Sequence, residues 1–241
     1  MEIRSEVGAY YLNRRELDRA LEEFLAVDEL HRTTGDMQSF DHTQMMLGVV
    51  YRKKHEYEKA IKYLAALHER GKAQPGQPIT ATAAHHIAWI HLEQGDLVEA
   101  RRMCGEAIAG YHEQNDARGL SDAYEQLAAI LIEEGHLDEA EGYLVRCINM
   151  RKQIGNQPGL VSSLRRLALV RLLTRDYWQV FGLMWVILGN YLRMNMLSRQ
   201  RIARLVQDAI VGTGKAIFNR NKPQASGVSV IESFFRALVG R

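Results

Sequence analysis

Apolar residues recur along much of the chain at the three- and four-residue spacing of amphipathic helices. One such set predicts a helix from about 120 to 134, with these inward positions: Ala123, Leu127, Ile130 and Leu131. A second set predicts a helix from 137 to about 153, with these inward positions: Ala140, Leu144, Cys147 and Ile148. Gly135–His136 separates the two segments and Gly155–Asn156 follows the second, so this stretch is predicted to be a pair of helices joined by a tight turn.

The same pattern recurs every 40 residues. The hexapeptides RELDRA (15–20), HEYEKA (55–60), GDLVEA (95–100) and GHLDEA (135–140) align, and RDYWQV (175–180) is a weaker fifth copy. Fixed-period similarity of this length is typical of a solenoid, in which each repeat packs on its neighbours. The carboxylates and histidine of EEGHLDEAEGYL (133–144) therefore belong to a turn and a solvent-facing side rather than to a catalytic cluster.

Five columns of the repeat hold small or large apolar residues. Small columns predict close helix crossings, because a larger side chain there would overpack the contact by about 1–3 kcal/mol. The columns are Gly8/Gly48/Ala88/Ala128/Ala168, Val7/Leu47/Ile87/Leu127/Leu167, Ala20/Ala60/Ala100/Ala140/Val180, Phe24/Leu64/Cys104/Leu144/Met184 and Val27/Leu67/Ala107/Cys147/Ile187.

These columns and the GHLDEA-type turn resemble the tetratricopeptide repeat, in a variety with a 40-residue period, over about residues 2–195. The longer period is similar to that of kinesin light-chain and spindle-orientation scaffolds and of bacterial regulators that bind peptide pheromones. The resemblance implies an all-α, right-handed α-solenoid of helix-turn-helix repeats. We expect a solenoid over 1–197, with repeats at about 1–37, 38–77, 78–117, 118–157 and 158–197.

The C-terminal part, 198–241, is expected to cap the solenoid, since a terminal repeat otherwise exposes an apolar face. One amphipathic helix is predicted over about 198–219, followed by a flexible joint at 219–227. A short amphipathic helix then carries apolar residues that would fold back on the solenoid or mediate self-association: Val228, Ile231, Phe234, Phe235 and Leu238. No N-terminal cap is evident, so we expect either a longer natural chain or another molecule over that face.

Charge changes the picture because it is unevenly distributed. Residues 1–160 hold 18 Lys and Arg against 26 Asp and Glu, whereas residues 161–241 hold 13 against 3. This polarity suggests a nucleic-acid or membrane contact at the basic end, a head-to-tail contact between copies, or an acidic partner. With the missing cap and the spare helix, it predicts a homo-oligomer. No signal peptide or membrane span is evident, so we expect a cytoplasmic protein without a membrane partner.

Motifs for chemistry are not evident. The sequence has no HExxH or CxxC metal pattern, no G-x-S-x-G elbow, no Walker loop and no dinucleotide-binding fingerprint. Its two cysteines, Cys104 and Cys147, fall in packing columns. We therefore predict a protein that is not an enzyme, with no metal and no cofactor.

By the resemblance, the first helix of each repeat lines a concave groove. Trp89 would be its apolar anchor, with Arg52 and Lys53 on one side and acidic residues on the other. The predicted partner-binding residues are His42, Met45, Arg52, Lys53, His85, Trp89, Glu93, Asp122, Glu125, Glu133 and Arg165.

Three functions remain open. The first is a non-catalytic scaffold that binds a protein or peptide ligand in the groove. The second is the peptide-sensing domain of a bacterial transcription regulator or signalling protein, which an upstream DNA-binding segment would support. The third and weakest is nucleic-acid contact through basic residues of the C-terminal third: Arg165, Arg166, Arg171, Arg175, Arg193, Arg199, Arg201 and Arg204.

Overall fold

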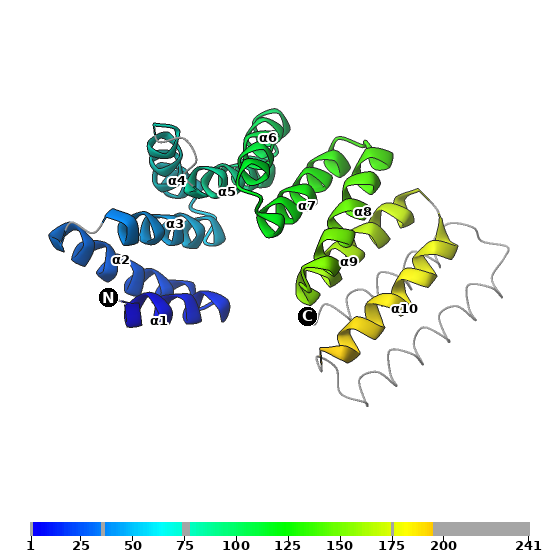
Figure 1. Ribbon diagram of the computed structural model, residues 1–241, viewed down its shortest axis with the longest axis horizontal. Helices are drawn as coiled ribbons and strands as arrows, with labels where there is room; N and C mark the ends of the chain where they lie inside the picture. Colours follow the sequence, from blue (N-terminus) through cyan, green and yellow to red (C-terminus); the bar gives the residue numbers. More distant parts are fainter. Residues whose placement is uncertain (1, 35–36, 74–77, 175, 195–241) are drawn as a thin grey trace. The chain divides into compact units, whose positions relative to one another are not determined.

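The computed structural model describes residues 2–34, 37–73, 78–174 and 176–194, which contain ten α-helices and no strand (Figure 1). The helices are α1 Glu2–Asn13, α2 Leu17–Thr34, α3 Met37–Lys53, α4 Tyr57–Lys72, α5 Pro78–Gln94, α6 Leu97–Glu113, α7 Ala117–Glu133, α8 Leu137–Gln153, α9 Gln157–Leu173 and α10 Tyr177–Arg193. The predicted helix over about 198–219 and the predicted short amphipathic helix with Ile231, Phe234, Phe235 and Leu238 lie outside the described residues.

The chain divides into two compact units, 1–183 and 184–241, and the packing below is that of the first unit. From α1 to α9, each helix packs against the next one along the chain. The first helices of successive pairs also touch, α3 against α5 and α5 against α7. This arrangement confirms the predicted all-α solenoid of helix pairs.

The predicted helix over 137–153 is confirmed by α8, which has those bounds. The helix predicted from 120 begins earlier, at Ala117. Asp116 precedes it, and its carboxylate accepts hydrogen bonds from the backbone N–H groups of Arg118 and Gly119, both at 3.0 Å. This N-cap satisfies donors that the first turn leaves unpaired, so the helix starts at the cap rather than at the first apolar residue.

The repeating columns are packing positions, as predicted. Ala20, Ala60, Ala100 and Ala140 are all fully buried. A Cβ atom added to Gly48 would lie 2.6 Å from Cγ of Leu64, so the α3–α4 crossing requires glycine there. The small columns thus bring the paired helices together, and the large columns fill the space beside them.

The turn between the paired helices uses one conformation in the four copies whose central residue the structure describes. Its central residue has positive φ in four successive copies: Arg15, His55, Gly95 and Gly135. At Gly135, the N–H of His136 donates to the carbonyl of Leu131 at 2.8 Å, and the N–H of Gly135 donates to that of Ile132 at 3.1 Å. This is a Schellman motif, which ends a helix at a left-handed residue. In EEGHLDEAEGYL, accordingly, Ala140 and Leu144 are buried whereas His136, Asp138 and Glu139 are exposed.

Candidate functional site

The predicted partner-binding residues lie on α3, α5, α7 and α9, and we call the side of these helices that carries them the first-helix face. Because α3 contacts α5 and α5 contacts α7, residues on successive helices are neighbours. His42, Lys53 and Glu133 are exposed. Met45 differs, since only 4% of it is exposed and it lies in the hydrophobic core. We therefore leave Met45 out of the surface that a partner could reach.

Arg52 and Glu93 form an ion pair between α3 and α5. The Arg52 Nη1 atom lies 2.5 Å from Oε1 of Glu93, and the two side chains are mostly buried. The sequence suggested separate basic and acidic patches, but these two charges neutralise each other. Lys53 stays exposed, and burial of part of its stem, with the positive charge of Arg52 nearby, lowers its pKa. Because Arg52 is paired and Lys53 is exposed, Lys53 is the cation of α3 that a partner could contact.

His85 and Trp89 are linked on α5. The Trp89 indole N–H donates to Nε2 of His85 at 3.2 Å, so that ring nitrogen carries no proton. Burial, helped by the charge of Arg52, lowers the pKa of His85 to about 4. His85 is therefore neutral near pH 7 and fixes the indole of Trp89. One helix further on, the Gln126 amide donates to the backbone carbonyl of His85 at 3.0 Å and ties α7 to α5.

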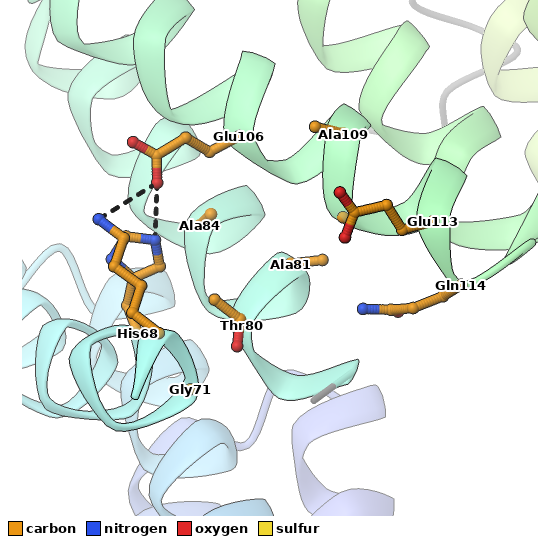
Figure 2. A pocket seen from close by; sticks show the side chains of 11 residues that line it. His68, Gly71, Thr80, Ala81, Ala84, Glu106, Ala109, Glu113 and Gln114 are labelled. Carbon is orange, nitrogen blue, oxygen red and sulfur yellow. Dashed lines mark hydrogen bonds and ion pairs between the residues drawn. The ribbon is translucent and has the colours of Figure 1, made fainter. Parts of the chain in front are cut away.

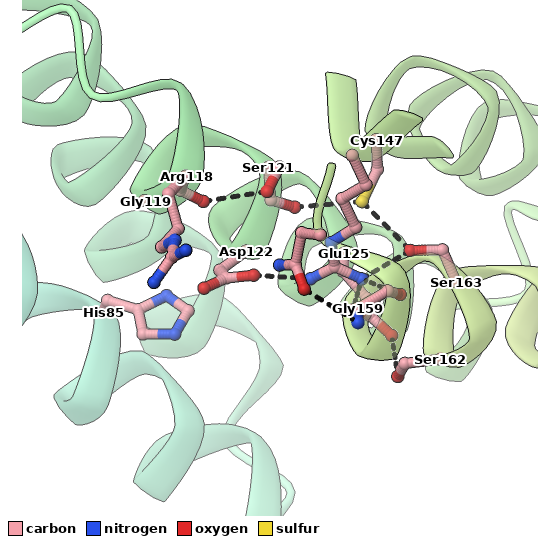
Figure 3. Close-up of polar contacts among 12 residues, drawn as sticks. His85, Arg118, Gly119, Ser121, Asp122, Glu125, Cys147, Gly159, Ser162 and Ser163 are labelled. Atoms are coloured by element: carbon pink, nitrogen blue, oxygen red, sulfur yellow. Dashed lines mark hydrogen bonds and ion pairs between the residues drawn. The ribbon is translucent and has the colours of Figure 1, made fainter. Parts of the chain in front are cut away.

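Glu125 is the centre of a second polar cluster, between α7, α8 and α9 (Figure 3). Its carboxylate pairs with the guanidinium of Arg151, accepts from the Ser162 hydroxyl at 2.7 Å and lies 3.5 Å from Nε of Arg166. Glu125 was predicted as a groove acid, but only 7% of the residue is exposed. Its charge therefore holds repeats together and is not presented to a partner.

Arg151, on α8, contributes most of the bonds of this cluster. Its guanidinium also pairs with Asp122, donates to the carbonyl of Gly159 at 2.7 Å and donates to the Ser163 hydroxyl at 2.5 Å. Burial alone would lower the pKa of Arg151, but the interactions with Glu125, Cys147 and Asp122 together outweigh it and the pKa is raised. The cluster thus contains a permanently charged arginine whose two Nη atoms are bonded, while its buried Nε has no described hydrogen-bond partner.

What the first-helix face leaves open is largely apolar. Trp89 and Leu92 on α5, and Ile132 on α7, are partly exposed. On α9 the apolar surface widens, where Leu169 is 44% exposed and Leu173 is 50% exposed. Arg165 lies beside them, partly exposed. Lys53, Glu133, Arg165 and the partly exposed carboxylate of Asp122 add charges of both signs around this apolar stripe.

A surface pocket of about 320 Å³ lies away from this stripe, between α4, α5 and α6 (Figure 2). Its walls include Gly71, Ala81 and Gly110. The Nε2 atom of His68 lies 2.9 Å from the carboxylate of Glu106, which is also 3.5 Å from Nζ of Lys72. Three of the ionisable groups of this pocket, those of His68, Lys72 and Glu106, thus already pair with one another.

Reactive arrangements are not found in the part of the chain that the structure describes. No group of three or more His, Cys, Asp or Glu side chains within it could hold a metal ion. Cys104 and Cys147 are buried free thiols, and burial raises the pKa of both, that of Cys104 to about 12. None of the described helices is long and apolar enough to cross a membrane.

The basic residues of the C-terminal third are partly committed to ion pairs. Arg166 lies against Glu125, and Arg171 pairs with Glu141 and Asp176. Arg175, Arg199, Arg201 and Arg204 lie outside the described residues.

Sequence reasoning missed Arg151 as the organising residue. It lies on a second helix, where a basic residue in the last turn is ordinarily solvated. A signal was available, since Tyr111 and Arg151 are 40 residues apart and each is followed eight residues later by a glycine, Gly119 or Gly159. A Cβ atom at Gly119 would lie 2.4 Å from the Tyr111 ring, and one at Gly159 would lie 2.9 Å from Nε of Arg151. Each glycine therefore makes room for the large residue.

Comparison with known families gives tetratricopeptide repeat models over residues 41–113 and 120–154. Residues 41–113 and 120–154 thus match tetratricopeptide repeats, which confirms the resemblance seen in the repeat columns. Comparison with curated proteins gave no match.

Solved structures share the fold at low sequence identity. A Rap protein complexed with competence and sporulation factor matches with a TM-score of 0.77 and 15% identity, over 98% of this chain and 63% of that one. The apo form of RapI matches at 0.72 and 11%, over 99% and 82% of the two chains. TPR-like repeats of a Podospora anserina protein assigned as a kinesin light chain match at 0.62 and 15%, over 81% and 96%. At these identities the likeness concerns the fold.

Proposed function

We propose that this protein is a non-catalytic scaffold that binds a protein or peptide ligand on its first-helix face. The observation that carries the proposal is the apolar stripe of Trp89, Leu92, Ile132, Leu169 and Leu173, which spans three successive first helices. Partly exposed aromatic and aliphatic side chains on a rigid frame are what protein-binding hot spots use. The ligand would bind as an extended or helical segment that lies across these helices.

The polar contacts support this function by making the frame rigid. Arg52–Glu93, Gln126–His85 and Arg166–Glu125 each join a first helix to the next, and in each the residues are 41 apart in sequence. Since the side chains are already ordered, a ligand loses less affinity to the entropy of arranging the surface. Specific charge recognition would fall mainly to Lys53, Glu133 and Arg165.

The test is selection of binding peptides from a random library displayed on phage, followed by affinity measurements on the selected peptides. Leu169→Glu places a charge in the stripe and is expected to weaken binding by about tenfold or more. The matched control is Val98→Glu, since Val98 is an exposed apolar residue on α6, at 82% exposure, and outside the face. Equal affinities for Leu169→Glu and wild type would refute the assignment of the face.

A second candidate is a peptide-sensing regulatory domain. The observation that favours it is the fold shared with Rap proteins, among them the one complexed with competence and sporulation factor and the plasmid pLS20 regulator in complex with the Phr* peptide. A sensor must change conformation on binding, whereas a scaffold need not. Small-angle scattering of the protein with and without a selected peptide tests this candidate, because a change in the radius of gyration on binding is required of a sensor but not of a scaffold.

A further inference from the structure

Helix α10 carries two tryptophans and two glycines along one line of its surface. Trp178, Gly182, Trp185 and Gly189 follow one another at intervals of four, three and four residues, so they form a row about 16 Å long. Trp178 is 89% exposed and Trp185 is 51% exposed. No described atom lies within 4 Å of a Cβ atom added to either glycine. We call these four residues the tryptophan–glycine row.

The exposure of the row belongs to its place in the repeat. On α8, which packs against the following helix α9, the equivalent positions are exposed too: Asp138, Gly142, Val145 and Asn149. The four equivalent positions on α2, and the four on α6, are exposed as well. The row therefore faces outward because second helices present this line to the outside, and not because it lies near the end of the described helices.

The residue types on this line set α10 apart from the earlier second helices. The equivalent lines of α2, α4, α6 and α8 hold these charged residues: Asp18, Glu22, Glu29, Glu58, Lys62, Glu69, Arg102 and Asp138. In α10, by contrast, no charged residue precedes Arg193. Glycine within a helix is also destabilising relative to alanine. Large apolar side chains and glycines on an outward line therefore indicate contact with another surface rather than with water.

We propose that the tryptophan–glycine row is a homodimer contact, in which α10 of one copy packs antiparallel against α10 of a second copy. The row is complementary to itself about a two-fold axis between positions 183 and 184. Trp178 and Gly189 lie equally far from this centre on either side, and so do Gly182 and Trp185. Each Trp178 then faces the partner's Gly189, and each Trp185 faces the partner's Gly182. Every large side chain meets the space beside a glycine, as a two-fold contact requires.

Size and charge favour this occupant over the other helices that a second copy could offer. A parallel pair would place Trp178 against Trp178 and Arg193 against Arg193. In the antiparallel pair, Arg193 at the end of one helix comes within about one turn of Asp176 at the start of the other, so opposite charges meet. Docking of α10 on the outward line of α2, α4 or α6 would instead bury unpaired charges.

An exchange of one large and one small residue tests the register. Gly182→Trp puts two tryptophans at the centre of the row and Trp185→Gly leaves none, so each variant alone is expected to dimerise at least about tenfold more weakly than wild type. An equimolar mixture should recover dimerisation, because the added tryptophan of the first variant then faces the added glycine of the second.

Sedimentation velocity at equal total concentration measures this recovery, and circular dichroism checks that each variant keeps its helices. Recovery in the mixture cannot come from a variant that has merely lost its fold. A wild-type chain that stays monomeric, or a mixture no more dimeric than its two components, would overturn the proposal.

A charge placed in the row gives a second test with a matched control. Trp178→Glu is expected to weaken dimerisation by about tenfold or more, because the contact would bury the carboxylate without a partner. Val98→Glu changes the equivalent position of α6, which is 82% exposed, and should dimerise as wild type does. Equal dimerisation of Trp178→Glu and wild type would refute the contact. Monomeric wild-type protein that co-sediments with phosphatidylcholine–phosphatidylglycerol vesicles would identify a membrane as the occupant instead.

Discussion

The junction between α4 and α5 and the junction between α8 and α9 occupy equivalent places in the repeat, yet they are built from different residues. Gly71 on α4 and Arg151 on α8 are two 40-residue periods apart. Gly71 packs on Thr80, and a Cβ atom there would lie 1.9 Å from the Thr80 hydroxyl. Arg151 packs instead over Gly159 and fills its junction with a charged side chain.

The difference shows that equivalent junctions can pair a small residue with a larger one in either order along the chain. Where the second helix contributes glycine, the next helix contributes a larger residue and the surface pocket of about 320 Å³ remains beside them. Where the second helix contributes Arg151, the next contributes Gly159, and the buried charge requires Asp122, Glu125 and Ser163 as partners. The first junction should therefore depend on size alone, and the second on both size and charge.

The largest effect is expected from removing the charge at the second junction. Arg151→Met leaves Glu125 buried with its main partner lost, which should cost about 3–5 kcal/mol of unfolding free energy. Adding Glu125→Gln should restore most of that loss, because the uncompensated charge is then gone. Urea denaturation of the single and double variants checks this. If the double variant is no more stable than Arg151→Met, charge is not what distinguishes this junction.

The second prediction uses the pH dependence of His85, which occupies in α5 the position that Glu125 occupies in α7. A histidine in an unfolded chain titrates near 6.5, whereas burial lowers the pKa of His85 to about 4. Between these values the unfolded chain binds the extra proton, so the stabilisation from neutral His85 is complete above about pH 6.5. It is lost as the pH falls toward 4, by at most about 3 kcal/mol.

His85→Gln should flatten this loss, because glutamine does not titrate and can still accept the hydrogen bond from Trp89. Part of the slope should remain, since burial also lowers the pKa of His86 well below its usual value. Urea midpoints at pH 7.5 and pH 5 measure the difference. Identical slopes for His85→Gln and wild type would contradict the prediction.

The third prediction tests whether side-chain volume alone limits the packing of α6 against α7, where Tyr111 meets Gly119. Gly119→Ala should destabilise the protein by about 1–3 kcal/mol, because its Cβ atom would lie 2.4 Å from the Tyr111 ring. Gly142→Ala on α8 is the matched control, since no atom lies within 4 Å of its Cβ position. That change should stabilise the helix by up to about 1 kcal/mol. Thermal unfolding that shifts both variants in the same direction would show that packing at Gly119 is not limiting.

The helix pairs were predictable because their cause is local and repeated. Columns such as Ala20, Ala60, Ala100 and Ala140 report one packing constraint four times, so a single sequence is enough to detect it. The start of α7 was not predicted well, because the signal is the Asp116 cap rather than the apolar spacing. Both signals are short-range and can be read from the chain.

Contacts between side chains on neighbouring first helices were harder to predict. The sequence placed Arg52 and Glu93 on this face, but their ion pair depends on how far each first helix is rotated against the next. That rotation follows from packing at the junctions, which the spacing of residues within a helix does not encode. Arg151 was missed for the same reason, since its burial depends on space left by Gly159 in the following repeat.

The smallest expected effect concerns the turns that precede the two compared second helices, α4 and α8. His55 and Gly135 hold the same place, with φ of 61° and 82°. A residue with a Cβ atom pays about 1–2 kcal/mol in this region, so His55→Gly should relieve strain. Loss of the 2.7 Å contact between Nδ1 of His55 and the Tyr57 hydroxyl offsets part of that gain. We expect a net stabilisation of up to about 1 kcal/mol, measured by urea denaturation.

The reverse change, Gly135→His, should destabilise the protein by about the same free energy. Stabilisation by both changes would show that backbone strain does not distinguish the two turns.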